Sequence, residues 1–381
     1  MRAVFKYLPY PWPIAAGLFV FSALAYRWIL GGGRMDALLE RMLGSRVLTV
    51  ALFGAIVVAT WRLYPIADAL KLQGRGSTAD DALIVPLQTW LAGRPLYSSH
   101  LMRGVAASPG PGWIFWNAPF TLTGGYFLLT AFYVGMLWVA IAGERRNILP
   151  ANRVLLLLVS SLAFWELTVI GHDIIATSCA IGALLLWTVR AFERGSMSQT
   201  ALLAIGWGTL ATARILYPFL IPLLGLLLWK RDARLAGTLA AVGFATTALW
   251  HLPFLLTNHP YDPFHLWDRA RGGMGLPLIA AGGVATLAIG VTAGLRVTRE
   301  TRSVLGWFLA CLLVPLVFIS AGELIAVGGQ LAHWEGANYL IPALGPCFAW
   351  LTAEPETSES LEERKASISL VPRPPNTSDF V

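Results

Sequence analysis

The sequence predicts an all-α protein that crosses a membrane many times, on three observations. Hydrophobic residues make up 56% of the 381 residues and charged residues only 13%, whereas soluble domains are about a quarter charged. The mean hydropathy is +0.63. The apolar runs are about 20 residues long without alternation, which favours helices over the strands of a transmembrane β-barrel. The net charge of +7 comes mainly from arginines in short loops between these runs, so we expect no nucleic-acid partner.

The apolar runs predict a bundle of about 10 to 11 helices. The single spans are expected at residues 11–30, 47–65, 126–142, 154–170, 174–189, 236–256, 276–295, 304–321 and 339–351. Segment 200–229 is interrupted by Arg214, Pro218 and Pro222. It is too long for one straight crossing and too short for two, so we expect a broken or paired set of short helices there.

The chain divides into three parts. Residues 1–46 hold an additional transmembrane helix and a basic loop, residues 47–352 form the core, and the Glu/Ser/Pro-rich residues 353–381 predict a disordered tail. The positive-inside rule places the arginine-rich short loops and the tail in the cytoplasm. The opposite face then receives the long polar loop of residues 66–122 and the 171–173 turn.

Asp80 and Asp81 are the candidate acids of the long loop. Adjacent carboxylates on a helix do not point the same way, so we expect at most one of them to face a site. The alternative is the solvated start of a surface helix, with Ser77 or Thr78 as its cap. Spacing alone leaves both interpretations open.

The Trp-rich segment 109–120, PGPGWIFWNAPF, follows in the same loop. It is too short to cross a membrane and predicts an amphipathic helix at the membrane surface, in the belt where aromatic residues gather.

The turn Gly171-His172-Asp173 lies between two consecutive spans. An acid and an imidazole at membrane depth are costly unless they pair with each other or serve a site, which favours a functional role. Glu166 precedes Asp173 by about two helical turns and would face the same cavity if one helix ran through both. Arg214 either pairs with a carboxylate or holds a phosphate, and both alternatives stay open.

Two further groups lie on the same predicted face. His333, Glu335 and Tyr339 precede the last span, either as an interfacial anchor or as part of a site. The second polar loop holds two histidines and two aspartates whose spacing matches no helical ligand pattern, so we expect no metal and no other cofactor. These are His259, Asp262, His265 and Asp268.

Several motifs occur in the order found in GT-C superfamily glycosyltransferases. Asp80-Asp81, followed by WLAGRPLY (90–97) and SPGPGWIFWNAPF (108–120), resembles the first external loop of that superfamily. GHDIIATSCAIGALLL (171–186) resembles its second acidic turn, and ATARILYPFLIPLL (211–224) its broken-helix segment. The resemblance is to the polyprenyl-phosphate-mannose-dependent group that includes the phosphatidylinositol-mannoside α-1,2-mannosyltransferases. It covers residues 47–351. The chain departs from the family pattern in its additional first span, its acidic doublet, and the missing aromatic residue after the acid.

The resemblance implies an inverting transfer of a hexose, expected to be mannose, from a polyprenyl-phosphate donor to a glycolipid or glycan acceptor. The site would lie at the extracytoplasmic face of a bacterial plasma membrane, in contact with membrane lipid. Asp80 or Asp81 would act as the base, and a cation would steady the departing phosphate. The candidate cations are Arg214, Arg94 and His333. Acceptor contacts would come from Tyr97, Trp113, Trp116, Glu335 and Tyr339.

The alternative function is a multispan transporter or flippase for a lipid or polyprenyl phosphate. Arg214 and Glu166 would then be substrate contacts within the membrane. The gathering of polar residues on one face, and a hydropathy pattern without an inverted repeat, favour the transferase.

Overall fold

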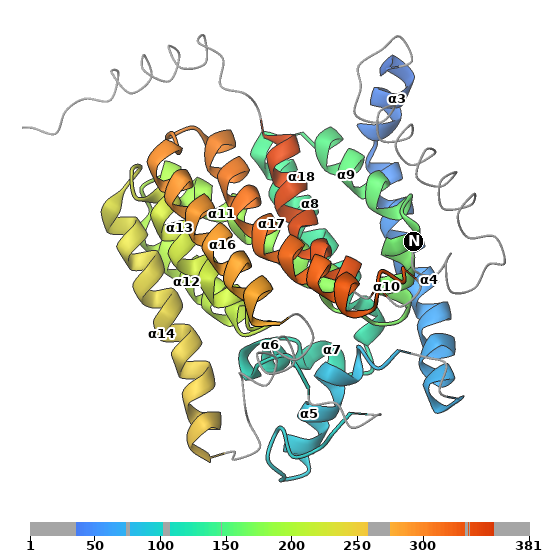
Figure 1. Ribbon diagram of the computed structural model, residues 1–381. Coiled ribbons are helices and arrows are strands. Elements are labelled where there is room, and N and C mark those ends of the chain that lie inside the picture. The colour runs from blue at the N-terminus through green and yellow to red at the C-terminus, as the bar shows by residue number, and fades with distance from the viewer. Residues whose placement is uncertain are drawn as a thin grey trace, which may run out of the picture.

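The computed structural model describes residues 36–73, 77–101, 107–145, 147–257, 275–331, 334 and 336–353. Helices dominate these residues and no strand occurs among them, which confirms the all-α prediction (Figure 1). Six helices are long and apolar enough to cross a membrane, or up to seven if one bent pair counts as a span. The chain is therefore a multi-pass helical membrane protein. The count of 10 to 11 crossings stays a prediction. The expected first span and most of the tail lie outside the described residues.

Helix α11 occupies the centre of the bundle. Of its apolar window 83% is buried, against 11% for α4 and α16, whose side chains face outward where lipid would lie. The six long helices are α4 (Arg46–Ala69), α8 (Leu129–Arg145) with η2 (Tyr126–Leu128) before it, α11 (Ile174–Glu193), α14 (Ala233–Thr257), α16 (Leu276–Arg296) and α17 (Thr301–Ala326). The bundle is completed by shorter elements, among them α3 (Asp36–Leu43), η4 (Gly336–Ala343) and α18 (Leu344–Thr352).

The span expected at residues 154–170 is a bent pair. Helix α9 (Leu149–Val159) and helix α10 (Leu162–Val169) meet at 74°. Two serines explain the break: the Ser160 hydroxyl donates to the carbonyl of Leu157, and Ser161 caps α10 by accepting from the amide of Phe164. Serine favours helix ends in this way because its side chain competes for backbone hydrogen bonds.

The interruption predicted within residues 200–229 is confirmed. Helix α12 (Met197–Ala211) stops, and the chain resumes in η3 (Tyr217–Phe219) and α13 (Leu220–Leu228). Arg214 lies in the gap, where the backbone is free of the regular helical pattern. The break therefore presents a guanidinium at the end of two apolar helices.

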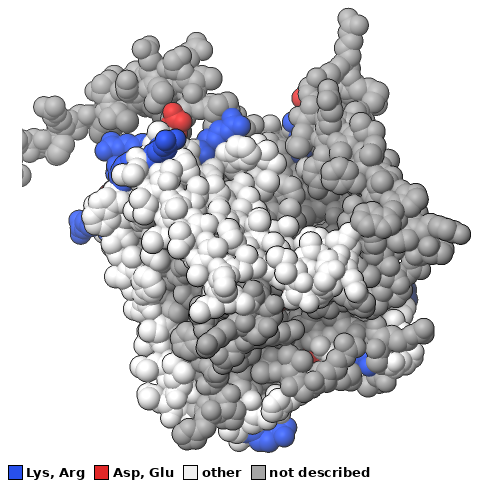
Figure 2. All heavy atoms as spheres, in the orientation of Figure 1, with Lys and Arg blue, Asp and Glu red and all other residues white. Residues whose placement is uncertain are grey.

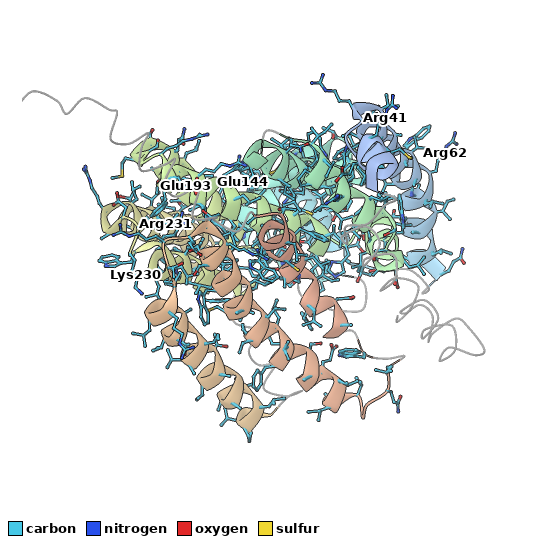
Figure 3. The ribbon with its side chains drawn as sticks, turned by 90° about the horizontal axis from the view of Figure 1, so that it is seen from above. Arg41, Arg62, Glu144, Glu193, Lys230 and Arg231 are labelled. Atoms are coloured by element: carbon cyan, nitrogen blue, oxygen red, sulfur yellow. The ribbon has the colours of Figure 1, made fainter. Side chains whose placement is uncertain are left out.

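The short basic loops lie at one end of the bundle, where most of the Lys and Arg visible in Figure 2 are found, although basic side chains are visible at the lower end as well. Nε of Arg190 lies 2.7 Å from a carboxylate oxygen of Glu144, and Nη1 of Arg231 lies 3.8 Å from one of Glu193. Figure 3 looks onto this end. The opposite end carries the short helices α5 (Asp81–Leu91), α6 (Pro111–Trp116) and α7 (Ala118–Leu122), which lie across the bundle (Figure 1). The expected segregation of basic loops from the long polar loop is thus present, whereas its assignment to cytoplasm and exterior stays a prediction.

Candidate functional site

The acidic centre consists of Asp68, Lys71, Asp80 and Asp81. Lys71 lies on η1 (Leu70–Gln73), directly after α4, and its Nζ reaches into the start of α5. It lies 2.9 and 2.8 Å from the two carboxylate oxygens of Asp80 and 2.8 Å from Oδ1 of Asp81. It also forms an ion pair with Asp68, three residues earlier.

Both carboxylates of the acidic doublet contact Lys71, whereas the expectation that at most one of them faces a substrate stays a prediction. Asp80 is the N-cap residue of α5 and Asp81 is its first residue. The ammonium of Lys71, which lies on a different element, therefore contacts both carboxylates. The cap named for the alternative interpretation, Ser77 or Thr78, is not found, because the N-cap residue of α5 is Asp80. Ser77 accepts a hydrogen bond from the amide of Ala79, in the turn before the helix.

Asp80 is completely buried. The Tyr64 hydroxyl donates to its Oδ2 at 2.7 Å. Burial raises the pKa of Asp80 from its ordinary value of 3.8 to about 6, although the hydrogen bonds from Lys71 and Tyr64 act in the opposite direction. Burial lowers the pKa of Lys71, but its hydrogen bonds to Asp68, Asp80 and Asp81 raise it by more, so the ammonium stays charged. Asp80 therefore holds its proton more tightly than an ordinary aspartate does.

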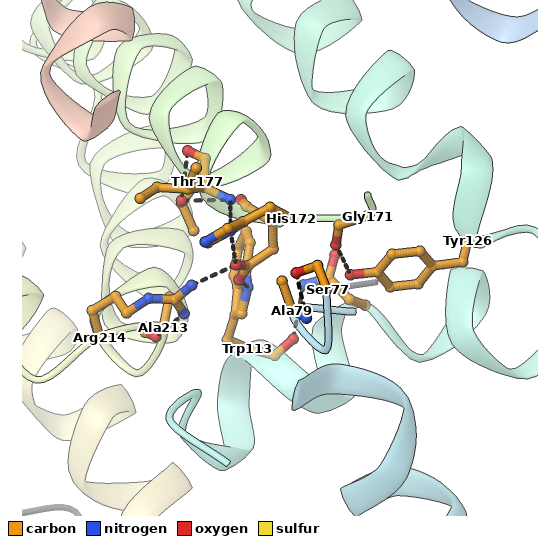
Figure 4. Close-up of polar contacts among 12 residues, drawn as sticks. Ser77, Ala79, Trp113, Tyr126, Gly171, His172, Thr177, Ala213 and Arg214 are labelled. Carbon is orange, nitrogen blue, oxygen red and sulfur yellow. Dashed lines mark hydrogen bonds and ion pairs between the residues drawn. The ribbon is translucent and has the colours of Figure 1, made fainter. Parts of the chain in front are cut away.

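The arginine centre consists of Trp113, His172, Asp173 and Arg214 (Figure 4). Arg214 pairs with Oδ1 of Asp173, and Nδ1 of His172 lies 3.4 Å from the same oxygen. The indole of Trp113 donates to Oδ2 at 2.9 Å. Burial raises the pKa of Asp173, but the charge and hydrogen bond of Arg214 together with those of His172 lower it by more, so this buried carboxylate stays ionised. Of the two alternatives for Arg214, the structure contains the carboxylate pair.

The turn at residues 171–173 connects the two centres. Gly171 has a φ of +71° and packs against the side chain of Asp80, while Asp173 two residues later pairs with Arg214. The Tyr126 hydroxyl donates to the carbonyl of Gly171 at 2.9 Å, and its ring stacks on Tyr64 at 5.6 Å between centroids. The candidate residues Asp80, Asp81, His172, Asp173 and Arg214 are thus brought together at one end of the bundle. Their roles stay predictions.

Other candidates lie around this core. Arg94 is exposed beyond the end of α5. The Tyr97 hydroxyl donates to the carbonyl of Pro109 at 2.9 Å, which ties the two halves of the long loop together. Trp116 is 52% exposed. Tyr339 lies on η4 and is 42% exposed.

Glu166 is expected to face the same cavity as Asp173 only if one helix runs through both, and this condition is not met. Helix α10 ends at Val169 and Gly171 turns the chain with a positive φ, so no continuous helix carries Glu166 and Asp173 on one face. His333 and Glu335 fall outside the described residues, as do all four residues of the second polar loop. Across the described part of the chain, no group of three or more His, Cys, Asp or Glu side chains is placed to hold a metal ion.

Sequence reasoning missed Lys71, Tyr64 and Tyr126. A signal for Lys71 was available: it follows Asp68 by three residues, the spacing of an ion pair on a helix, and it is the one lysine of the long polar loop. The two tyrosines gave no comparable signal. Both lie in apolar spans, where aromatic residues at the membrane surface are common.

The bundle contains an apolar groove. It has a volume of about 680 Å³ and runs between α13, α16 and α17. Ile215, which follows Arg214, lines one end, and Leu226 and Val291 line it further toward the basic end. The groove therefore starts at the residue that follows Arg214 in the sequence, although Arg214 itself does not line it, and continues between α13, α16 and α17.

The site as a whole has a polarity. One end holds three carboxylates around a single ammonium, and the other holds a guanidinium with a single carboxylate. Ile215, which follows Arg214 in the sequence, lines the apolar groove. Such an arrangement can accept a proton at the first end and bind an anion at the second. In comparisons with known proteins, no family model, no curated protein and no solved structure matches this chain.

Proposed function

We propose that the protein is a glycosyltransferase that moves a hexose from a polyprenyl-phosphate donor to a hydroxyl of a glycolipid or glycan acceptor. The observation that carries the proposal is the connection of Asp80 to the Asp173–Arg214 pair through one turn. A displacement at a sugar carbon needs a proton acceptor on one side and a stabilising cation on the other, and the two centres supply one of each.

The acidic centre supports the role of base. A general base works best when its pKa lies near the operating pH, and that of Asp80 is raised to about 6. Because Asp80 is buried in this arrangement, the acceptor hydroxyl would reach it only after the segment around η1 and α5 has moved. Asp81 has 18% of its side chain exposed and is the alternative base.

The arginine centre and the groove support a lipid-phosphate donor. Arg214 has 19% of its side chain exposed. Its Nη2 pairs with Asp173 and its Nη1 donates to the carbonyl of Ala213, which leaves further N–H groups of the guanidinium to donate to a phosphate oxygen. A donor whose phosphate reaches Arg214 would lay its apolar chain in the groove that starts at Ile215. Mannose as the sugar follows from the family resemblance alone.

The proposed reaction is a single displacement. The acceptor oxygen forms a bond to C1 of the sugar as the bond from C1 to the phosphate oxygen breaks. The acceptor proton passes to Asp80 or Asp81, and polyprenyl phosphate leaves with the bonding electron pair beside Arg214. No covalent sugar-enzyme intermediate forms, and the configuration at C1 inverts, as one base suffices for an inverting transfer.

The test uses the purified full-length protein in lipid nanodiscs with a panel of radiolabelled polyprenyl-phosphate sugars and a mixture of bacterial glycolipid acceptors. We expect label in an acceptor with one donor, and a loss of label in whichever of Asp80→Asn and Asp81→Asn removes the base. Glu193→Gln, which removes a carboxylate at the basic end, is the matched control and should transfer normally. Binding of every donor without any transfer would reject the proposal.

The apolar groove also fits a second function, a flippase for polyprenyl phosphates. In that case the acidic centre would be dispensable for movement of the lipid between leaflets, while Arg214 would be essential. A fluorescent polyprenyl phosphate in proteoliposomes separates the two functions. Lipid flipping that persists in the Asp80→Asn variant, together with an absence of sugar transfer, would favour the flippase.

A further inference from the structure

The ammonium group of Lys71 has enough carboxylate neighbours to use all of its hydrogen-bond donors. An ammonium group has three N–H donors, and three carboxylates surround this one, those of Asp68, Asp80 and Asp81. The side chain of Lys71 is 9% exposed. With one positive and three negative groups, the acidic centre repels anions, so Lys71 is not placed to bind the phosphate of a donor.

The ammonium also joins two elements that are separate in the sequence. Asp68 belongs to α4 and Lys71 to η1, whereas Asp80 and Asp81 form the start of α5. Three carboxylates within reach of one point repel one another, and a buried carboxylate without a cation is strongly unfavourable. Lys71 is the cation that makes this cluster of like charges possible.

Asp80 is oriented from three sides. Lys71 donates to both carboxylate oxygens, the Tyr64 hydroxyl donates to Oδ2, and the backbone of Gly171 packs against the Cβ. The titratable groups that face Asp80 are therefore Lys71, Tyr64 and Asp81, with Asp68 acting through the shared ammonium and Tyr126 through Gly171. Of these, Lys71 is the cation.

We propose that Lys71 is a positioning residue whose ammonium is the internal counter-ion of the acidic centre and keeps Asp80 ionised and aligned at the site. The proposal deepens the proposed function, since it rests on that function for its catalytic meaning, but the counter-ion role itself is measurable without any substrate. Loss of the ammonium should leave Asp80 in its place and shift its protonation to higher pH.

The experiment is an infrared titration of the carboxylic-acid stretching band of the full-length protein in lipid. The Asp80 band is identified by its loss in Asp80→Asn. The wild-type band should titrate near pH 6. In Lys71→Met we expect a midpoint higher by about one unit or more, because a cation within a few ångströms lowers a carboxyl pKa by about 1–3 units. Lys71→Arg keeps the charge and should stay within about half a unit of the wild-type midpoint.

Lys230→Met is the matched control, because Lys230 donates to the carbonyls of Leu295 and Val297 at the opposite end and should not affect the Asp80 band. An unchanged midpoint in folded Lys71→Met would overturn the proposal. If Lys71→Met does not fold, Asp81→Asn decides: removal of a competing carboxylate should lower the Asp80 midpoint, and an unchanged midpoint overturns the proposal equally. If the protein shows these shifts but transfers no sugar, the counter-ion role of Lys71 stands and the proposed glycosyltransferase function is rejected.

Discussion

A Cβ atom on Gly171 would lie 2.8 Å from the Cβ of Asp80, so the Asp80 side chain packs directly against the backbone of the 171–173 turn. Only glycine combines this close approach with a φ of +71°. The geometry of the acidic centre therefore depends on a residue that has no side chain and takes no part in proton transfer.

Gly171→Ala should reduce both stability and transfer. The strained backbone and the clash with Asp80 and Tyr64 together should lower the free energy of unfolding by roughly 2 to 5 kcal/mol. Gly195→Ala is the control, since Gly195 has a φ of +62° with no atom near its added Cβ. It should lose only about 1 to 2 kcal/mol and keep full activity. Equal effects of the two substitutions, measured by denaturant titration and transfer assay, would contradict the packing argument.

Substitution of the doublet should separate the two acids. Asp80→Asn keeps the shape of the side chain but removes the base, so we expect transfer to fall by at least about a hundredfold. Asp81→Asn should have a smaller effect if Asp80 is the base, and a larger one if Asp81 is. Initial rates at saturating donor and acceptor give the comparison. Wild-type rates in both single variants and in the double variant would show that neither carboxylate is the base.

The pH dependence of activity should run against that of stability. A base must be deprotonated to work, so transfer should fall about tenfold per unit as the pH drops below about 6. The folded pKa of Asp80 is raised above its ordinary value, so its protonation favours the folded state, and its contribution to stability grows as the pH falls from above 6 toward 4. Thermal melting at pH 5 and pH 7 checks that the loss of activity is not unfolding.

Arg214→Ala should destabilise the protein and weaken donor binding. It leaves Asp173 buried without a cation, which costs about 3 to 5 kcal/mol. The double variant Arg214→Ala/Asp173→Asn removes the unpaired charge and should regain most of the stability. If Arg214 binds the donor phosphate, the KM for the donor stays raised in the double variant while that for the acceptor does not. Recovery of donor binding together with stability would mean that Arg214 is structural.

Filling the apolar groove should weaken the binding of long-chain donors more than that of short-chain donors. Gly283 lines the groove on α16 and has open space beside it. Gly283→Leu should raise the KM for a full-length polyprenyl donor more than for a short-chain analogue, because only the long chain occupies the groove. Gly237→Leu, on α14 with equally open surroundings, is the control. Equal KM changes for both chain lengths would contradict chain binding there.

Apolar runs predicted the long helices to within a few residues. Residues 276–295 are α16 (Leu276–Arg296), and residues 174–189 are the first part of α11 (Ile174–Glu193). Hydropathy predicts these helices because only a long run of predominantly apolar side chains is stable within the lipid bilayer. The bend between α9 and α10 was missed, since it depends on two serines in an otherwise apolar run.

The charged half of the site was predicted in outline. Asp80, Asp173 and Arg214 stood out because charges near membrane depth are rare. Their partners did not. Lys71 joins residues on two different elements, and Trp113 donates to Asp173 from 60 positions away, contacts that depend on how the bundle folds.

The 171–173 turn has a consequence for how two ligands would influence each other. It touches Asp80 at one end and carries Asp173 at the other. An anion that drew Arg214 away from Asp173 would release that end of the turn and thereby shift the support beneath Asp80. Occupancy of one half would then change the affinity of the other, and by reciprocity the second ligand would change the first.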